Sequence, residues 1–529
     1  MSTTTTADVV VAGAGHNSLI TAAYLARSGR EVVVLDARAV PGGGAATDEA
    51  LSPGYLLDPC STGHTIIQTN PVIAADELGL LGVYGLEYLE PDPFAHVAFP
   101  DGRHLTTWLD LDRTCEELEA FSAADAEAYR RLLAEYDEVK HIFGAASFTP
   151  VGFGPSLEER LREHPRGNIW RRRSALSAWE VIRREFESPH VQAYMLWQAY
   201  QTLVPVDAPG SGVLAYSVVF GRQRRSWTIP RGGSGRLTGA LVACIEDHGG
   251  TVLCGRRVHR LIVQDGRCAG VETEDGDRWL ARDAVVSTIH VKHLVEMAPR
   301  ELWGEDFIYG VETFDIGVPC SAAYLATTAP PEFATPAGPR TAVSAGLAGW
   351  PEDVIAFNRA LRDGRWIETP QWVLVATPTL ADPSRAPEGH HTVKFLAPQS
   401  YGFEERRDEH FAGLMRRVQD VCPGFTEDVV IEHMVRMPED IERQNEHMIH
   451  GTFHGGDRTL PQSGALRPVP GWAQHRMPIP GLYQTGGTTH PGGSITGGPG
   501  RNAAIVLLAD LGTTIEEVVG AGRPRAGRH

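Results

Sequence analysis

The N-terminal segment holds a pattern that few folds can accommodate. A run of valines ends at Val11 and is followed directly by Gly13 and Gly15, after which an alanine- and leucine-rich stretch runs to Gly29. A second valine-rich run then ends at Asp36. Buried parallel strands read as continuous β-branched runs, and a glycine turn between such a strand and a helix lets the backbone approach a pyrophosphate. The pattern predicts a strand–helix–strand unit that binds a dinucleotide, with the carboxylate of Asp36 at a ribose hydroxyl group.

Ser18 stands where this type of turn usually has its third glycine. That glycine normally allows the helix to pack closely on the strand. Serine is small enough to occupy the position with a slight shift, so the dinucleotide interpretation is kept. The alternative is a parallel strand–helix–strand unit that binds no nucleotide.

A second glycine-rich run lies at the other end of the chain. The residues from Gly481 to Ala504 include eight glycines in twenty-four positions and lead into the apolar stretch from Ile505 to Leu511. Glycine at this density is costly in chain entropy, and it suits backbone that presses against a flat or anionic group. The apolar stretch is predicted to be a helix, whose N-terminal N–H groups favour electron-rich atoms. Both ends of the chain are therefore predicted to hold one long ligand.

A third glycine cluster, from Pro41 to Thr47, follows the second predicted strand. Binding of NAD alone does not require it, whereas an extended flavin dinucleotide commonly crosses the chain there a second time. The order of these features, together with the segments Pro230–Gly235 and Thr489–Gly492, resembles the FAD-dependent phytoene desaturases and phytoene-dehydrogenase-like oxidoreductases. These form the carotenoid desaturase and ketolase branch of the amine oxidase superfamily, and the resemblance covers nearly the whole chain.

The resemblance implies an α/β fold in which a Rossmann-type FAD-binding domain carries an inserted mixed α+β substrate-binding domain. The FAD-binding domain is expected to be discontinuous and to comprise residues 7–90, 224–295 and 470–520. The substrate-binding or cap domain is expected to comprise residues 91–223 and 296–469, and residues 1–6 and 521–529 are expected to be disordered ends. Hydrophobic periodicity predicts helices at 124–140, 157–162, 234–248 and 403–419, and strands at 251–258, 260–264, 269–273, 279–287, 372–376 and 391–397.

The resemblance also implies that FAD is the cofactor and indicates which residues bind it. They lie in the first glycine turn, after the second strand, in the strand around residue 258 and in the C-terminal loop. The expected set is Gly13, Gly15, His16, Asn17, Ser18, Asp36, Ala37, Arg38, Gly43, Gly44, Ala45, Val258, Gly486, Gly487, Gly493, Ile495 and Thr496.

The activity implied is FAD-dependent dehydrogenation, or desaturation, of a C–C bond in an apolar or alicyclic small-molecule substrate, with hydride transfer to flavin N5. No second strand–glycine–helix unit for NAD(P)H is visible, so O2 or a quinone is the expected electron acceptor. A carotenoid-type ketolase or oxidase is the alternative with redox chemistry, and a flavin-bound isomerase or a prenyl-group carrier is the alternative without it. Amine oxidation ranks lower, because the C-terminal loop lacks the acid that amine oxidases keep there.

Histidines concentrate towards the C-terminus. His490, inside the glycine-rich loop, and His454 are the candidate catalytic residues, as groups that polarise the flavin or act as a base. The alternative for His490 is a hydrogen bond that only holds the loop. The spacing of His447, His450 and His454 suits a metal, but Gly451 interrupts the helix that would align them, so no metal is expected.

Other segments are candidates for the substrate site. Residues 195–200 and 213–220 are apolar and aromatic, and they either line a substrate cavity or belong to the core. His64 is a further candidate for the region near the flavin.

The seven cysteines are scattered without paired spacing, which argues against a disulfide framework or a zinc site and indicates a reducing, cytoplasmic location. A net charge of −18 argues against general attraction to nucleic acid or anionic lipid. The N-terminus lacks the pattern of a signal peptide, and no apolar run is long enough to form a transmembrane segment.

One basic segment interrupts the acidic composition. Residues 166–184 carry six arginines with Trp170 and Trp179. Such a segment is either an amphipathic helix that gives peripheral membrane contact or a solvated helix face. The second interpretation is favoured, with Glu180, Glu185 and Glu187 as the partners of the arginines.

Overall fold

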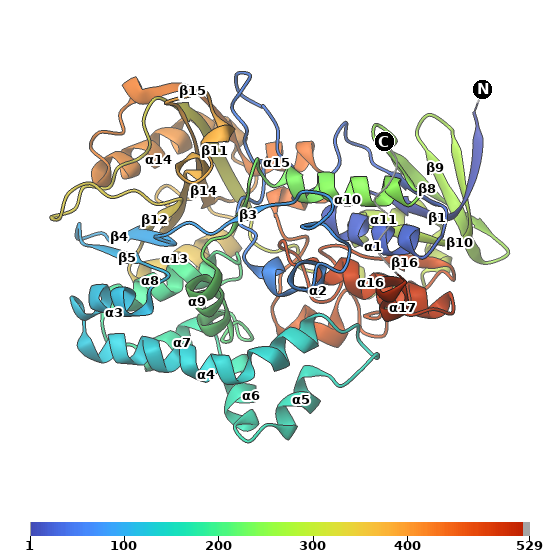
Figure 1. The fold of residues 1–529 in the computed structure, drawn as a ribbon, viewed down its shortest axis with the longest axis horizontal. Helices are drawn as coiled ribbons and strands as arrows, with labels where there is room; N and C mark the ends of the chain where they lie inside the picture. Colours follow the sequence, from blue (N-terminus) through green and yellow to red (C-terminus); the bar gives the residue numbers. More distant parts are fainter. Residues whose placement is uncertain (1, 522–529) are drawn as a thin grey trace.

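The computed structural model describes residues 2–521, and in it the chain forms two seven-stranded sheets. Figure 1 shows one sheet at the right, with β1 and β10, and the other at the upper left, with β11 and β14. A short antiparallel ribbon of β3 (Tyr88–Leu89) and β6 (Ile229–Pro230) lies between them (Figure 1).

Valine-rich strands form the first sheet. Its order is β7–β2–β1–β10–β9–β8, with β16 paired to β10. Its strands are β1 (Thr4–Ala12), β2 (Val32–Leu35), β7 (Thr251–Leu253), β8 (Val258–Gln264), β9 (Arg267–Thr273), β10 (Arg278–Ser287) and β16 (Leu482–Gln484). All are parallel except the β8–β9 hairpin and its pairing to β10. The predicted α/β class with a Rossmann-type domain is confirmed.

Helices cover both faces of this sheet. The helices of this unit are α1 (His16–Arg27), α2 (Pro71–Ala74), α10 (Gly235–Asp247), α11 (Val291–Leu294), α12 (Glu305–Glu312), α16 (Gly498–Asp510) and α17 (Ile515–Gly520). Side chains alternate along β1, so Val9 and Val11 pack with α1, α10 and α16, whereas Val10 packs with Phe307 and Val311 of α12. The result is a three-layer unit.

The second sheet is mostly antiparallel and has the order β15–β11–β14–β13–β12–β4–β5, with only the β12–β4 pair parallel. Its strands are β4 (Ala95–Ala98), β5 (His104–Thr107), β11 (Cys320–Thr327), β12 (Ser344–Ala348), β13 (Trp372–Ala376), β14 (His391–Pro398) and β15 (Val430–Arg436). Its helices are α3 (Leu111–Glu119), α4 (Ala123–Ser147), α5 (Leu157–Glu163), α6 (Gly167–Ala175), α7 (Ala178–Glu185), α8 (Pro189–Tyr200), α9 (Leu214–Arg225), α13 (Pro351–Arg362), α14 (Arg407–Val421) and α15 (Pro438–Gln444).

The two faces of this sheet have different covers. Leu374 and Leu396 share one core with α4, α8 and α9, while Val373 and Phe395 pack with α14 on the other face. Figure 1 shows the helical layer below the sheet and α14 on the opposite side. The period of two along β13 and β14 therefore separates the face that meets the helical layer from the face that meets α14.

Several predicted elements are present with shifted ends. The helix predicted at 124–140 is α4, which runs on to Ser147, and the helix predicted at 403–419 begins only at Arg407. The strand predicted at 251–258 is broken into β7 and the start of β8. Gly255 lies at the break with a φ of 70°, a conformation that glycine adopts without strain.

The paired strands β3 and β6 mark where the chain passes between the two sheets, next to the boundary expected at 90/91 and a few residues after the one expected at 223/224. Two details differ. Residues around Trp303, Phe307 and Phe314 pack in the core of the first sheet, beyond the boundary predicted at 295. β1 begins at Thr4, inside the segment predicted to be disordered, because it pairs with β10 from there on. The C-terminal end predicted to be disordered lies, beyond Ala521, outside the described residues.

A buried ion pair joins the two units. Asp58 and Arg385 have fully buried side chains, with 2.5 Å between Oδ2 and Nη2. Asp58 also accepts hydrogen bonds from the hydroxyl of Thr47 and from the backbone N–H of Ser234. Burial alone would raise the pKa of Asp58, but the Arg385 guanidinium holds it below its usual value. Lys394 of β14 donates to the carbonyl of Asp58, so one short segment is fixed to the second sheet by two cations.

The arginines of the basic segment form ion pairs with acids of neighbouring helices. Trp170 is fully buried, and Arg166 and Arg173 pair with Glu135. Glu158 and Glu185 are further partners. Of the three acids expected as partners, only Glu185 forms such a pair, because the long helix α4 supplies the nearest carboxylate instead. Within residues 2–521 no helix is long and apolar enough to cross a membrane.

Candidate functional site

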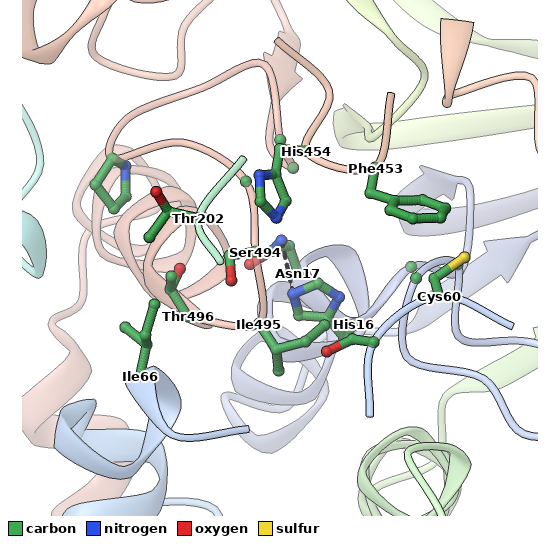
Figure 2. A pocket seen from close by; sticks show the side chains of 18 of the residues that line it. His16, Asn17, Cys60, Ile66, Thr202, Phe453, His454, Ser494, Ile495 and Thr496 are labelled. Atoms are coloured by element: carbon green, nitrogen blue, oxygen red, sulfur yellow. Dashed lines mark hydrogen bonds between the residues drawn. The ribbon is translucent and has the colours of Figure 1, made fainter. Parts of the chain in front are cut away.

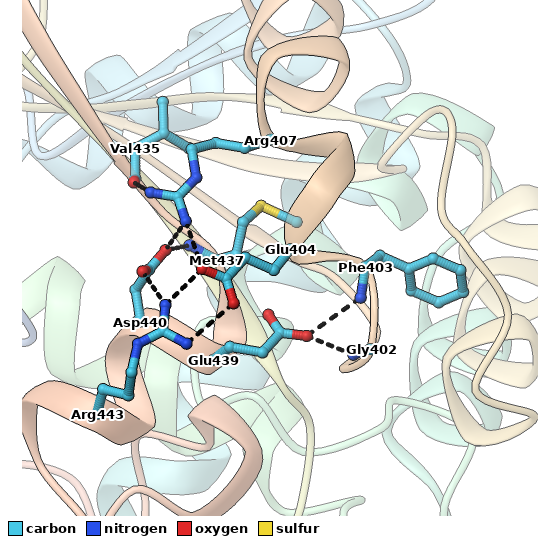
Figure 3. Close-up of polar contacts among 9 residues, drawn as sticks. All are labelled: Gly402, Phe403, Glu404, Arg407, Val435, Met437, Glu439, Asp440 and Arg443. Atoms are coloured by element: carbon cyan, nitrogen blue, oxygen red, sulfur yellow. Dashed lines mark hydrogen bonds and ion pairs between the residues drawn. The ribbon is translucent and has the colours of Figure 1, made fainter.

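One large cavity of about 1160 Å³ is lined by residues of both units. At one end it begins at the glycine turn after β1, and at the other it reaches residues 201–204 that follow α8, and α9, β13 and β14. Figure 2 shows part of its wall, where His16 and Asn17 face His454 and Thr202 across the space. The volume exceeds the roughly 300–1,000 Å³ of a site for one drug-sized ligand, so the cavity has room for a cofactor and a second molecule.

The turn after β1 is built without side chains where the chain is most crowded. Gly13 has a φ of 98°, and a Cβ atom there would collide with the side chain of Thr288 at the end of β10. The Gly13 N–H donates to the carbonyl of Leu35, which binds the turn to β2. Gly15 forms a bridge to Gly42, so the first and third glycine clusters meet at one place.

Asp36 lines the cavity at the end of β2. Its two carboxylate oxygens accept the backbone N–H groups of Ala14 (2.6 Å) and Arg38 (2.8 Å). Burial raises the pKa of this carboxyl group, and the two N–H donors oppose that shift. A carboxylate offers about four lone-pair positions, so two remain for the hydroxyl groups of a ligand.

The C-terminal loop forms the opposite wall. Side chains at Gly487 and Gly493 would collide with the carbonyl of His454, and one at Gly486 would collide with Thr288. Arg467, fully buried, donates to the carbonyls of Gly487 and Asp457, which holds the loop from behind. The close packing of backbone on backbone explains why this run requires glycine.

Two helix N-termini converge at the cavity. Asn17 near the start of α1 accepts the N–H of Gly500 near the start of α16 (3.3 Å), and Thr21 donates to the Gly500 carbonyl (2.8 Å). Asn70 donates to the carbonyl of Thr496 (2.9 Å), which fixes the last residues before α16. The N–H groups of Gly498 and Gly500 already donate to Thr496 and Asn17, so α16 offers this wall the positive end of its dipole instead of free donors. The dipoles of both helices make the wall attractive to anionic and electron-rich groups.

Most of the expected cofactor-binding residues lie on the cavity wall. They are Gly13, Gly15, His16, Asn17, Asp36, Ala37, Arg38, Gly43, Gly44, Val258, Gly486, Gly487, Gly493, Ile495 and Thr496. Ser18 and Ala45 are fully buried behind it, and the Ser18 hydroxyl donates to the carbonyls of Gly13 and Gly15. The glycine cradle, the carboxylate at the end of β2 and the paired helix N-termini fit FAD.

The other end of the cavity is an apolar chamber. We use this name for the part lined by Gln201, Leu203, Val213, Leu214, Ser217, Val218, Phe220, Gly221, Arg222, Leu374, Lys394 and Leu396. Residues of the segment 213–220 therefore line the cavity, which was one of the two roles predicted for it. Residues 195–200 do not line the cavity, and Met195, Leu196, Trp197 and Tyr200 are core. Among the polar residues of the chamber are two cations, Arg222 and Lys394. The chamber, as defined by these residues, contains no carboxylate.

Lys394 projects from β14 and is 5 % exposed. Its ammonium group donates to the carbonyls of Asp58 (3.1 Å) and Cys60. Burial lowers the pKa of Lys394 to about 8. The chamber therefore presents a positive charge at neutral pH, held by neutral oxygen atoms.

The two candidate catalytic histidines occupy different positions. His454 lines the cavity, and burial lowers its pKa to about 3, so its imidazole is neutral at pH 7. The ring of His490 is not on the cavity wall: its Nε2 lies 3.0 Å from the carbonyl of Ala146 at the end of α4. His64 is fully buried behind the wall, with Nε2 2.9 Å from the hydroxyl of Ser234.

The three histidines with metal-like spacing point to separate neighbours. The ring of His447 lies 5.3 Å from that of His290, whereas the ring of His450 packs on Tyr401 at 4.3 Å. Residues 2–521 contain no group of histidine, cysteine or acidic side chains that would hold a metal ion.

Three residues of the wall gave no signal in the sequence. Thr288 separates Gly13 from Gly486, and Arg222 and Lys394 are the buried cations of the chamber. The strand ending at Thr288 was recognisable, but its contact with both glycine loops depends on tertiary structure. Arg222 stands in the run Arg222–Arg225, which resembles an exposed face.

The comparison with known proteins agrees with this geometry. The pattern that defines the family described as "Flavin containing amine oxidoreductase" matches residues 19–498. A mouse protein called pyridine nucleotide-disulfide oxidoreductase domain-containing protein 2 is 26% identical over 95% of this chain and 94% of its own length. One of the limonene dehydrogenase subunits of Castellaniella defragrans is 27% identical over 97% of each chain. Phytoene desaturase (lycopene-forming) of Pantoea ananas is 26% identical over 95% of this chain and 99% of its own.

Solved structures show the same fold. Putrescine oxidase bound to putrescine superposes with a TM-score of 0.61 at 14% sequence identity, over 96% of this chain and 99% of the other. At this identity the likeness describes the arrangement of the two sheets and their helices.

Proposed function

We propose that this protein removes two hydrogens from a C–C bond of a largely apolar substrate. The chain belongs to the flavin containing amine oxidoreductase family. It is an FAD-dependent oxidoreductase, and the relatives named for limonene and phytoene are what bring C–C dehydrogenation into the proposal. O2 or a quinone is the proposed electron acceptor.

The observation that carries the proposal is the lining of the chamber. Its surface is mainly aliphatic and aromatic, and the only acidic residues on the whole cavity wall, within residues 2–521, are Asp36 and Glu446. Glu446 pairs with Arg257, and Asp36 lies at the dinucleotide end of the cavity, so neither belongs to the chamber. An ammonium substrate would meet Lys394 and Arg222 instead of a carboxylate, which disfavours amine oxidation.

Bound FAD would supply an acceptor for two electrons in the form of a hydride at N5. The proposed task of the chain is to hold the cofactor between the two glycine loops and to exclude water from the chamber. Asp36 is proposed to bind the ribose, and the N–H groups at the start of α1, together with the dipoles of α1 and α16, are proposed to attract electron-rich atoms of the cofactor.

We assign His454 a role in orienting groups within the cavity. Its lowered pKa of about 3 makes it a weak proton acceptor, so a hydrogen bond suits it better than general base catalysis. His490 is assigned to holding the loop against α4 through the Ala146 carbonyl. Loss of hydride from an allylic carbon leaves a substrate cation whose neighbouring C–H is acidic, so its proton can pass to a weak acceptor such as a neutral imidazole or water. No strong base is required, which is consistent with both assignments.

The test is anaerobic reduction of the purified, FAD-loaded protein. A panel of cyclic and acyclic terpenes is mixed with the enzyme, and putrescine and benzylamine serve as matched amine probes. We expect a terpene to bleach the flavin absorbance and to yield a product lighter by two hydrogens. Bleaching by the amines alone would refute the proposal, a gain of oxygen would indicate a ketolase, and an isomer without bleaching would indicate non-redox chemistry.

A further inference from the structure

Arg222 is a buried cation that lines the chamber. It stands on α9, one turn after Val218, and the residue is only 5 % exposed. Its neighbours on the same wall, Ser217, Val218 and Gly221, are small or apolar. A guanidinium group removed from water in such surroundings is costly unless a negative charge or several hydrogen bonds compensate for it.

The compensation that the protein itself supplies is incomplete. Arg222 donates to the side-chain oxygens of Gln198 (2.8 Å) and Gln201, both of which are neutral. No carboxylate in the described part of the chain lies within ion-pair distance of it. These bonds engage two of the five N–H groups of a guanidinium. Burial accordingly lowers the pKa of Arg222 to about 9.

Two other buried arginines show how this protein compensates such a charge elsewhere. Arg385 has the carboxylate of Asp58 at 2.5 Å. Arg467 has no carboxylate partner, but it donates to the backbone carbonyls of Asp457, Gln462 and Gly487, among others. Arg222 has neither arrangement, and it differs from both in facing the cavity.

The glutamines beside Arg222 are oriented by the structure. Gln198 is fully buried and donates to the hydroxyl of Tyr194 (2.8 Å), which in turn donates to Thr107 (3.2 Å). This chain of donors turns the Gln198 oxygen towards the guanidinium. Gln201 also lines the cavity, and its buried Nε2 has no hydrogen-bond partner. Unused N–H donors of Arg222 and Gln201 thus gather on one part of the wall.

We infer that this part of the chamber binds a carboxylate, and that the natural substrate is an apolar molecule with a carboxylate at one end. The inference rests on the proposed function for the role of the chamber and adds the polar end of its substrate. A carboxylate would accept from the free guanidinium N–H groups and from Gln201 Nε2, and it would neutralise a buried charge that the protein itself compensates only in part. Charge-assisted bonds of this kind are about twice as strong as neutral ones.

The test uses three probes that share one carbon skeleton and differ only in an end group: limonene, perillyl alcohol and perillic acid. Their dissociation constants are measured on the FAD-loaded enzyme at pH 7 by calorimetry. We expect the acid to bind at least about tenfold more tightly than the alcohol and the hydrocarbon. Equal affinities, or no binding of the acid at millimolar concentration, would overturn the inference.

Substitutions of Arg222 test whether this residue causes the preference for the acid. Arg222→Met is expected to abolish the preference for the acid while leaving the affinity for limonene within about threefold, and Arg222→Lys is expected to retain part of the preference. The matched control is Lys140→Met, because Lys140 also lines the cavity but already pairs with Asp137. FAD content and circular dichroism check that each variant is folded, and Arg222→Lys carries the test if Arg222→Met does not fold.

The outcomes separate this inference from the proposed function. If a terpene bleaches the flavin but the acid binds no more tightly than the alcohol, the function stands and the carboxylate site is wrong. If no probe reduces the flavin but the acid binds through Arg222, the site stands and the proposed dehydrogenation is wrong. A preference for the acid that persists in Arg222→Met would also contradict the site.

Discussion

The two ends of the cavity are built in different ways. At the dinucleotide end, Gly13, Gly486, Gly487 and Gly493 stand where the chain packs too closely for a side chain, against Thr288 and the backbone of His454. In the chamber, side chains on α9, β13 and β14 make the wall, and its charges belong to single residues. A site made of backbone tolerates little substitution, whereas a site made of side chains changes its ligand when one residue changes.

The largest effect is expected where backbone meets backbone. In Gly493→Ala the added Cβ would collide with the carbonyl of His454, so the loop must move. We expect less than about a tenth of the purified protein to retain FAD, measured by absorbance and by acid release. Gly239→Ala is the control, since nothing lies within 4 Å of the added atom in α10. Normal FAD content in Gly493→Ala would contradict the account of the loop.

The second largest effect is expected at the dinucleotide end, where lowering the pH should reduce stability. Burial lowers the pKa of His454 to about 3 and those of His16, His447 and His475 to about 4. The unfolded chain takes up these protons near pH 6.5, so stability is full above pH 6.5 and is lost as pH falls towards 4. The free energy of unfolding falls by about 1.4 kcal/mol per pH unit for each histidine that stays neutral in the folded protein.

Thermal unfolding and FAD release, followed from pH 7.5 to 4.5, measure this effect. We expect FAD to leave before the helical signal is lost, because three of these histidines line the cavity. His447→Asn removes one titrating group and should make the dependence shallower. A melting temperature that is constant over this range would show that the imidazoles are not buried as described.

A smaller effect is expected in the chamber. Val218→Phe adds volume to the wall without touching the glycine loops. We expect kcat/KM for a substrate that bleaches the flavin to fall by about tenfold, with FAD content unchanged. Val218→Ala enlarges the chamber and should change the preferred size of substrate instead. Loss of FAD in Val218→Phe would mean that the two ends are not independent.

The smallest effect concerns Ser18, which stands where a third glycine is usual. Its hydroxyl donates to the carbonyls of Gly13 (2.6 Å) and Gly15 (2.9 Å). Ser18→Gly loses both bonds and adds the cost of glycine in a helix, so the free energy of unfolding should fall by about 1–2 kcal/mol in urea titration. Ser18→Ala isolates the contribution of the hydroxyl. A more stable Ser18→Gly would show that serine here only replaces glycine.

The contrast between a site built from backbone and a site built from side chains also explains which features were predictable from the sequence. The βαβ unit, Asp36 and the C-terminal loop depend on local requirements for glycine and on valine-rich strands, and these leave a readable pattern. Arg222 left none: Arg224 and Arg225 beside it are exposed, and only the turn of α9 directs Arg222 inward. Lys394 looked like an ordinary alternating position in a strand, because its burial depends on β14 packing against the segment around Asp58.

The placement of α12 over the first sheet left no signal in the sequence for a related reason. Phe307 and Val311 follow the predicted boundary at 295, yet they cover the first sheet because α12 folds back over β1. Nothing in the local composition distinguishes a helix that closes one domain from a helix that opens the next. Contacts between distant segments decide that, and a single sequence does not display them.

The ion pair between Asp58 and Arg385 matters for anyone who recombines this protein with its relatives. Asp58 belongs by position to the cofactor-binding half, but its charge is neutralised from the substrate half. A chimera that takes residues 296–469 from a relative without an arginine at the position of Arg385 would leave Asp58 as a buried charge without its partner, at a cost of about 3–5 kcal/mol. The unit to exchange is therefore the cap together with its matching residue 58.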